Sequence, residues 1–431
     1  MRFLLIAYEF PPSPSPQSLR WAYLVRELIA LGHQVKVLTI HLGGETAGLP
    51  HLPSTLETHR TFAGPVRGLL AYLRDRRQAQ ASSVTPDAGS PTPSSSPLRP
   101  PRSWKQSLSE TAQGLAARFV FPDVRGEWFP WARRALTRCL DEFKPDIVIS
   151  SHEPATSLEL GLLAKAKGFP WIADLGDPVL APYTPARWRD RALRVEGETC
   201  RKADHLIVTN AGAAALLAER HGHRNDISII SQGFAPEPPA ASANVLFDPV
   251  RLELLYTGSF YHFRKPDDLV AAIAAHPAAR LNIASVTVPQ SLLRAAESMP
   301  DQIRLLGFLP HRHILQLQRS ADVLINIAND DPSQVPGKLY EYLGSGRPIL
   351  HVTRQHDISS ELIATSRRGW VSDGSLASLQ GWLDRASLLK ETASLDEGLE
   401  LDLESVAQYS WPALTRRLEA IANQVLQAPQ R

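Results

Sequence analysis

Cysteine is scarce in this sequence, and neither sign of charge is in excess. The 431 residues include two cysteines, Cys139 and Cys200, with no Cys-x-x-Cys pair and no Cys/His cluster. A structural zinc site is therefore not expected, and reduced thiols in a cytoplasmic protein are the simpler interpretation. The formal net charge of +2 gives no bulk electrostatic argument for binding nucleic acid.

Long apolar runs are also missing. The run Phe3–Tyr8 is short and is followed by Glu9, which is typical of a buried strand and not of a signal peptide. The sequence has no stretch of about 18 or more apolar residues, so we expect no segment that spans a membrane.

The length and the order of apolar segments predict two α/β domains. A chain of 431 residues, 43% of them hydrophobic, suits two domains of roughly 150–250 residues. The expected strand Phe3–Tyr8, helix Leu19–Leu31 and strand Gln34–Ile40 form a βαβ unit, which predicts a parallel sheet. A second such series starts at Leu252–Tyr256, and a last helix, Trp411–Leu426, follows it.

Irregular segments place the domain boundaries. Residues 233–248 are rich in proline and alanine and predict a linker, which divides the chain into domains 1–232 and 233–410 and a C-terminal helix at 411–431. We expect the two doubly wound domains to face a central cleft, with ligands bound at the carboxyl ends of the strands.

A Pro/Ser-rich stretch at about 81–101 predicts a flexible surface insertion in the first domain. The segments Pro65–Arg77 and Trp104–Phe121 flank it, and both have the composition of amphipathic helices. They would either contact a membrane surface or pack on the domain with solvated arginines, and the second interpretation is favoured.

The stretch Val335–Ile349 is the most informative one. It opens a helix after an apolar strand, so free backbone N–H groups there could hold a phosphate. Lys338 would add a charge, and Glu341 could accept two ribose hydroxyls. Spacing alone leaves an ordinary helix start with a surface glutamate equally open.

These residues resemble a known family, the retaining GT-B glycosyltransferases of glycosyltransferase family 4, especially the bacterial cell-surface polysaccharide branch. The family pattern is matched by Pro336, Lys338, Glu341, Tyr342, Leu343, Gly346, Pro348 and Ile349. Further matches occur in the family's order along nearly the whole chain, among them Arg20, Gly32–Val35, Pro122–Asp123, Trp171–Pro178, Tyr256–Ser259, Leu306–Leu309 and Ser410–Trp411. The resemblance implies the GT-B fold, with a C-terminal helix that crosses back to the first domain.

The resemblance also implies which residues form the site. It assigns eight residues to the nucleotide-sugar donor: Lys265, Arg264, Gly258, Lys338, Glu341, Gly337, Ser333 and Gly307. By spacing alone, Arg264 and Lys265 would be a solvated loop pair. On the acceptor side the candidates are Asp174, Asp177 and, third in rank, His152. Aspartates of this kind also form turns, and a lone histidine is more often structural.

Three positions depart from the family pattern. Ser333 stands where many members have a glutamate that contacts the donor sugar, and Gly176 stands where many have a histidine. The first loop reads Ser15-Pro16-Gln17-Ser18 where many members have a pair of glycines, so it is stiffer.

The function implied is a retaining, hexosyltransferase-like enzyme. It would move a sugar from a nucleotide-diphosphate sugar to a glycan, a lipid-linked or another acceptor in glycoconjugate or polysaccharide biosynthesis. No Asp-x-Asp follows an expected strand, so we expect neither a metal nor a cofactor. A cytoplasmic location, with or without peripheral contact with the inner membrane surface, is expected. A silent GT-B subunit that binds a partner and a GT-B sugar-nucleotide epimerase stay open as alternatives, whereas a dehydrogenase is disfavoured because no Gly-x-Gly-x-x-Gly follows a strand.

Overall fold

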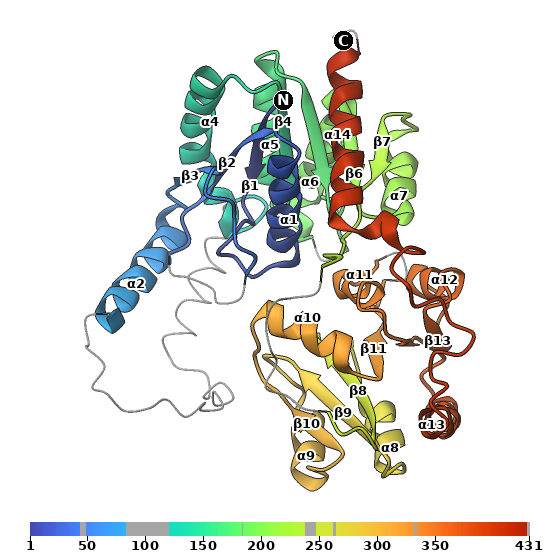
Figure 1. The fold of residues 1–431 in the computed structure, drawn as a ribbon. Coiled ribbons are helices and arrows are strands. Elements are labelled where there is room, and N and C mark those ends of the chain that lie inside the picture. Colours follow the sequence, from blue (N-terminus) through green and yellow to red (C-terminus); the bar gives the residue numbers. More distant parts are fainter. Residues whose placement is uncertain are drawn as a thin grey trace. The chain divides into compact units, whose positions relative to one another are not determined.

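The computed structural model describes residues 1–43, 49–82, 120–182, 184–237, 247–261, 264–331 and 334–428, with the backbone alone at 77–82. The chain forms two compact units that divide between Ser231 and Gln232 and again between Ala413 and Leu414 (Figure 1). The sequence placed these divisions after residues 232 and 410. The donor and acceptor roles given to the domains stay predictions.

The first unit is built on a parallel sheet of seven strands in the order β3-β2-β1-β4-β5-β6-β7. The chain therefore winds outward in both directions from the neighbours β1 and β4, as in a doubly wound fold. The strands are β1 (Arg2–Ala7), β2 (Gln34–Ile40), β3 (Glu57–Thr61), β4 (Ile147–His152), β5 (Trp171–Leu175), β6 (His205–Val208) and β7 (Ile227–Ile229).

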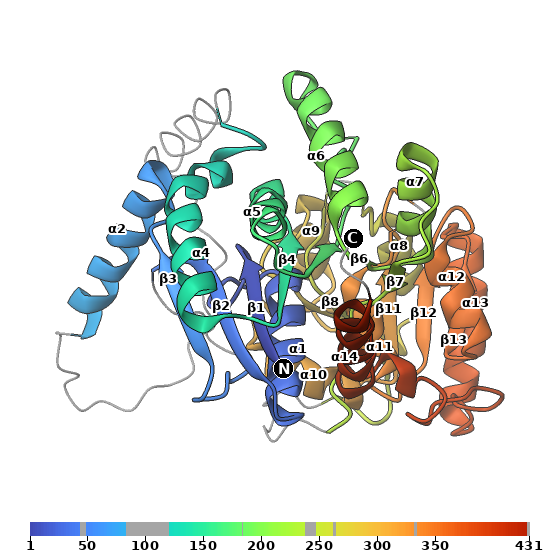
Figure 2. The ribbon, with the colours of Figure 1, turned by 90° about the horizontal axis from the view of Figure 1, so that it is seen from above.

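Helices cover both faces of this sheet. Figure 2 shows α1 and α14 on one side of the first unit and α4 and α5 on the other. The helices are α1 (Pro16–Ala30), α2 (Pro65–Ser82), α4 (Phe129–Phe143), α5 (Ala155–Ala166), α6 (Arg189–Lys202), α7 (Ala211–His221) and α14 (Trp411–Gln427), with short 3-10 turns at Val124–Trp128, Ala186–Trp188 and Ala407–Tyr409. Both faces of the sheet are thus buried, which explains why strands such as β1 and β4 are apolar or buried along their length.

Helix α1 begins earlier than the sequence indicated. The predicted start was Leu19, but the helix begins at Pro16, because the Ser15 side chain accepts a hydrogen bond from the Ser18 backbone N–H at 3.1 Å. A proline in the first turn costs nothing, since its missing N–H would have no partner inside the helix. The stiff loop that departs from the family pattern is therefore largely the first turn of a helix.

The second unit has a parallel sheet of six strands in the order β10-β9-β8-β11-β12-β13. The strands are β8 (Leu252–Thr257), β9 (Ala279–Ala284), β10 (Ile303–Leu305), β11 (Val323–Ile327), β12 (Ile349–Val352) and β13 (Gly369–Ser372). The helices are α8 (Asp267–Ala274), α9 (Gln290–Ser298), α10 (His311–Ser320), α11 (Gly337–Leu343), α12 (Ile358–Thr365) and α13 (Leu376–Glu391). The prediction of two doubly wound α/β domains is confirmed.

The last helix, α14, belongs mainly to the first unit. It begins at the predicted residue, and from Leu414 onward it is part of that unit. A stripe of buried side chains lies along it, at Leu414, Leu418, Ile421 and Ala422. Glu419 also accepts a hydrogen bond from His33, the residue just before β2. The distance between His33 Nε2 and Glu419 Oε1 is 2.8 Å. The end of the chain therefore completes the unit in which the chain begins.

Several predictions fall partly or wholly outside the described residues. These are the insertion from residue 83 onward, the helix at 104–119 and Ser333. Helix α2 is present, and it exposes Leu69 and Tyr72 by 58% and 60%. Whether it contacts a membrane stays a prediction. Among the described residues, no helix has the length and apolar character needed to cross a bilayer.

Two helical glycines are expected to respond in opposite ways to alanine. A Cβ at Gly161 in α5 would collide with the Trp171 indole, which donates a hydrogen bond to Ser150 at 2.9 Å. A Cβ at Gly381 in α13 would meet no atom within 4 Å. Gly161→Ala should therefore lower the free energy of unfolding by about 1–3 kcal/mol, and Gly381→Ala should raise it by about 0.5–1 kcal/mol. Denaturant unfolding measures both, and equal effects would contradict this description of the packing.

Candidate functional site

The candidate donor site lies at the point where the second sheet changes winding direction. Strands β8 and β11 are neighbours there, although β9 and β10 separate them in sequence. The segments that leave these two strands diverge to opposite sides, which opens a crevice at their carboxyl ends. Gly258 directly follows β8, and the segment after β11 leads into α11.

Lys338 points from the first turn of α11 to the end of β8. Its Nζ donates a hydrogen bond to the Thr257 carbonyl at 2.9 Å and lies 3.6 Å from the centre of the Tyr256 ring. Burial lowers the pKa of Lys338 well below its usual value, nearby Arg264 lowers it further, and Glu341 opposes them. The ammonium group is therefore poorly compensated in this structure, so an anion beside it would be strongly favoured.

Glu341 lies one turn further along α11 and is held by two side chains of α10. His311 Nε2 lies 2.8 Å from its Oε1, and Gln318 Nε2 donates to its Oε2 at 3.3 Å. Burial would raise the pKa of Glu341, but His311, Gln318 and Lys338 together hold it below the usual value. The group is thus a carboxylate at neutral pH, with acceptor capacity left on both oxygens.

Tyr342 fixes α11 against β8. Its hydroxyl accepts a hydrogen bond from the Thr257 backbone N–H at 3.0 Å and lies 3.0 Å from the Thr257 hydroxyl. The ring is fully buried. Since Lys338 bonds the carbonyl of the same threonine, the first turn of α11 has a defined position relative to the end of β8.

Arg264 and Lys265 differ in their surroundings. The Arg264 side chain is buried and donates to the Ser259 carbonyl at 2.9 Å and to the Asn329 side chain at 2.5 Å, so it joins the loop after β8 to the segment after β11. Lys265 is exposed and lines two hollows, of about 290 and 520 Å³. Lys265 is therefore the freer of the two to reach a phosphate.

The predicted glycines lie at the same edge of the sheet. Gly258 has φ +102°, and a Cβ there would lie 3.6 Å from the Lys338 side chain. Gly307, after β10, has φ +69°, and Gly337 is the first residue of α11. Positive φ favours glycine, and the lack of a side chain leaves room for a ligand to approach the backbone. The backbone N–H of Gly258 is already used, since it donates to the Ala284 carbonyl at 3.0 Å. Ser333 lies outside the described residues.

The structure gives Asp174 a buried ion pair. Its Oδ2 accepts hydrogen bonds from Arg20 at 2.7 Å, Gln17 at 2.9 Å, and Trp21 and Ser151 at 3.0 Å. Its side chain is 0% exposed and that of Arg20 is 1% exposed. Direct contact of Asp174 with an acceptor stays a prediction, but the contacts seen here hold α1 against the carboxyl ends of β4 and β5.

The two other acceptor-side candidates lie close to this pair in the fold. His152 ends β4, beside β5, and is 5% exposed. Burial lowers its pKa, nearby Arg125 lowers it further and Glu153 opposes both, so the ring is neutral at pH 7. Asp177 follows β5 and is exposed. Gln17 links these segments, because its amide also donates to the His152 carbonyl at 3.2 Å.

An Arg125-centred cluster lies at the same edge of the first sheet. Arg125 bonds Asp123 at 2.7 Å and Glu153 at 2.9 Å, and Glu9 lies 3.9 Å away. Glu9 follows β1 and Glu153 follows β4, the two central strands. Among the described residues, no group of three or more His, Cys, Asp or Glu side chains is arranged to hold a metal ion.

A match to a family model decides the classification. The model of the glycosyl transferase 4-like domain matches residues 17–233, just over half of the chain. The chain belongs to the glycosyl transferase 4-like family. The match covers most of the first unit, including Gln17, Arg20 and Asp174, but neither β1 nor α14. The resemblance to family 4 glycosyltransferases is confirmed.

Solved structures share the fold of this glycosyl transferase 4-like protein over its whole length. Sucrose-phosphate synthase from Thermosynechococcus elongatus has a TM-score of 0.67 at 16% identity, covering 100% of both chains. HepE from Anabaena has a TM-score of 0.60 at 13% identity, covering 98% of this chain and all of its own. A putative UDP-N-acetylglucosamine 2-epimerase from Listeria monocytogenes has 0.53 at 12%, covering 100% and 98%. Curated proteins give no match.

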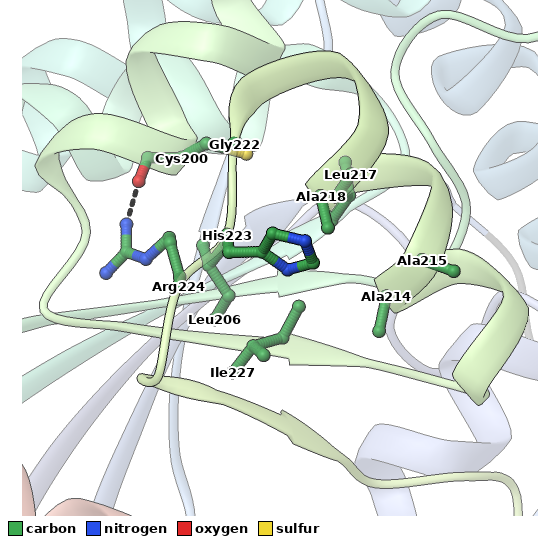
Figure 3. A pocket seen from close by; sticks show the side chains of 10 residues that line it. All are labelled: Cys200, Leu206, Ala214, Ala215, Leu217, Ala218, Gly222, His223, Arg224 and Ile227. Carbon is green, nitrogen blue, oxygen red and sulfur yellow. Dashed lines mark hydrogen bonds between the residues drawn. The ribbon is translucent and has the colours of Figure 1, made fainter.

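The first unit also has a separate hollow, which lies away from the carboxyl ends of its strands. It has a volume of about 220 Å³ and lies under α7 (Figure 3). Leu206 and Ile227, which line it, stand at the beginnings of β6 and β7, so the hollow faces the opposite end of the strands. Arg224, beside it, is bonded to Asp226 and to the Cys200 carbonyl. We assign this hollow no part in the site.

The sequence did not predict several residues that contact the candidate site residues of this protein. They are His311 and Gln318 in the second unit and Gln17 in the first. Tyr342 was noted as part of the family pattern, but its contact with Thr257 was not predicted. Gln17 stood in the loop that departs from the family pattern, where only the missing glycines were noticed. The signal for His311 was its place two residues after the Leu306–Leu309 segment, at the start of a helix.

Proposed function

We propose that the second unit binds a nucleoside-diphosphate sugar and that the protein transfers its sugar to a glycan, a lipid-linked or another acceptor in glycoconjugate or polysaccharide biosynthesis. The pairing of Lys338 and Glu341 carries this proposal. A cation with a poorly compensated charge and a carboxylate with free acceptor capacity lie one turn apart, beside Gly258 and the end of β8. A diphosphate and a ribose diol are complementary to this combination.

Family membership and the shared fold support the proposal. HepE, which has the same fold, was solved in complexes with UDP and with UDP-glucose. UDP is therefore our first choice of nucleotide for this chain.

We infer a reaction with retention of anomeric configuration. The acceptor oxygen bonds to the anomeric carbon on the face from which the diphosphate departs, the bond from that carbon to the diphosphate oxygen breaks, and the acceptor proton passes to a diphosphate oxygen. Lys338 and Lys265 stabilise the charge that builds on the leaving group. On this scheme the protein needs no metal ion.

The first unit would supply the acceptor side. Asp177 is exposed at the carboxyl end of β5 and is our candidate for direct contact with an acceptor hydroxyl. Asp174 and His152, which are buried, would hold that end of the sheet in place.

The proposal predicts a selective thermal shift. A saturating nucleoside diphosphate, at about 100 times its dissociation constant, adds about 2.7 kcal/mol to the unit that binds it. The unfolding midpoint should therefore rise by about 5–10 °C with one of UDP, GDP, ADP and TDP, and UDP is expected. No shift with any of the four, from folded protein, would refute the donor site and favour a silent partner-binding subunit.

A turnover assay separates transfer from epimerisation. The fold is shared with a putative epimerase, so binding of a UDP-sugar alone does not decide the reaction. NMR of the products should show the sugar joined to a new acceptor with its anomeric configuration kept. An epimerised UDP-sugar, or a product of inverted configuration, would contradict the proposal.

A further inference from the structure

Glu341 is held in place by a histidine from a different helix. His311 is the first residue of α10, and its Nε2 lies 2.8 Å from Glu341 Oε1 on α11. The His311 side chain is 16% exposed and that of Glu341 is 20% exposed, so the pair lies at the surface of the candidate site and not deep in the core. Gln318, two turns along α10, donates to the other oxygen at 3.3 Å.

The charges of His311 and Glu341 affect how a polyanionic ligand binds beside them. An unpaired Glu341 carboxylate would repel a diphosphate bound at Lys338. A protonated His311 cancels that charge while leaving each carboxylate oxygen a further lone pair for a ribose hydroxyl. A neutral His311 still donates its N–H but cancels no charge. The same contact can thus exist in two states of different affinity for an anion.

We propose that His311 is the positioning residue of the ribose-binding carboxylate, which it orients and neutralises, so that nucleotide-sugar binding is tighter while the His311 ring carries a proton. This inference rests on the proposed function, since it requires that Glu341 takes the ribose. It adds a residue outside the family pattern noted in the sequence and a pH dependence of the site.

The contact with Glu341 favours the protonated form of His311. Burial would lower the pKa of His311, but the Glu341 carboxylate raises it above the ordinary value. The ring is therefore fully charged below about pH 6.5 and loses its charge as the pH rises through the raised pKa. Among the described residues, titratable or charged groups around the pair include Lys338 and Tyr342 from α11, Arg319 from α10, Glu237 from the segment before β8 and, acting on Lys338, Arg264.

The test compares His311→Gln with the wild-type protein across pH. Glutamine keeps an N–H donor but cannot carry a charge. The probe is UDP-glucose, whose diphosphate is esterified at both ends and keeps a constant charge between pH 5.5 and 8.5, and calorimetry gives its dissociation constant. Wild-type protein should bind about three- to tenfold more tightly than His311→Gln at pH 6, which corresponds to a ligand-induced rise of half to one pKa unit. At pH 8.5 the two proteins should bind equally.

His313→Gln is the matched control, because it removes a second histidine of the same helix. It should bind like the wild type at every pH. A ratio between His311→Gln and wild type that does not change with pH would show a merely structural role and overturn the inference. Absence of UDP-glucose binding by wild-type protein at any pH would instead refute the proposed donor. If the His311→Gln variant fails to fold, NMR titration of the His311 ring in wild-type protein tests the same point, since its pKa must rise when UDP-glucose binds.

Discussion

Replacing Lys338 by alanine should weaken nucleoside-diphosphate binding by roughly 10- to 100-fold, the loss of a charge-assisted hydrogen bond of about 1.5–3 kcal/mol. In the structure its ammonium group has a backbone carbonyl and an aromatic ring as partners, and both are weaker partners than a diphosphate. Glu341→Ala should also weaken binding, because it removes the acceptor for the ribose hydroxyls. Calorimetry with UDP measures both effects.

Two further variants make this test specific. Lys338→Met keeps a long side chain over the Tyr256 ring, so a loss of affinity in that variant comes from the charge and not from packing. Lys202→Ala removes a lysine that is 59% exposed in the first unit and should leave the affinity unchanged. If both Lys338→Ala and Glu341→Ala bind UDP with unchanged affinity, the assignment of the donor site is wrong.

Replacing Asp174 by alanine should destabilise the first unit by about 3–5 kcal/mol, because it leaves the Arg20 guanidinium buried without its counter-charge. The two side chains are at most 1% exposed, so water cannot replace the lost partner. The unfolding midpoint should fall by about 6–20 °C. Nucleotide affinity of the protein that stays folded should change less than in Lys338→Ala.

The double variant Arg20→Met with Asp174→Leu should regain much of that stability, since neither side chain then carries a buried charge. Arg191→Ala is the surface control. Its guanidinium pairs with Glu159 at 2.7 Å but is 47% exposed, and its loss should cost less than about 1 kcal/mol. An Asp174→Ala variant with an unchanged midpoint would show that the ion pair is not structural, and it would favour the prediction that Asp174 contacts the acceptor.

Local patterns in the sequence predicted much of the architecture. The alternation of strand and helix segments predicted two doubly wound sheets, and the start of α14 was predicted at the correct residue. The edge strands β3 and β13 and the helices α4, α12 and α13 were not predicted. Strand β3 is largely half-exposed and polar, so it lacks the apolar run by which the central strands are recognised.

The candidate site was predicted only where its residues are close in sequence. Lys338 and Glu341 are three residues apart on one helix, so their spacing carries information. His311 lies 30 residues from Glu341, and Arg20 lies 154 residues from Asp174. Contacts of this kind depend on how strands are ordered in a sheet and on which helices become neighbours. One sequence alone does not contain that information in readable form.

The contact between His33 and Glu419 joins residues 386 positions apart. A ribosome makes the first unit's sheet before it makes the second unit, and it supplies helix α14 only after both. Until then, the surface that later receives Leu414, Leu418 and Ile421 is open to water and to chaperones. A chain that stops before α14 therefore leaves this apolar surface uncovered, and such surfaces promote aggregation.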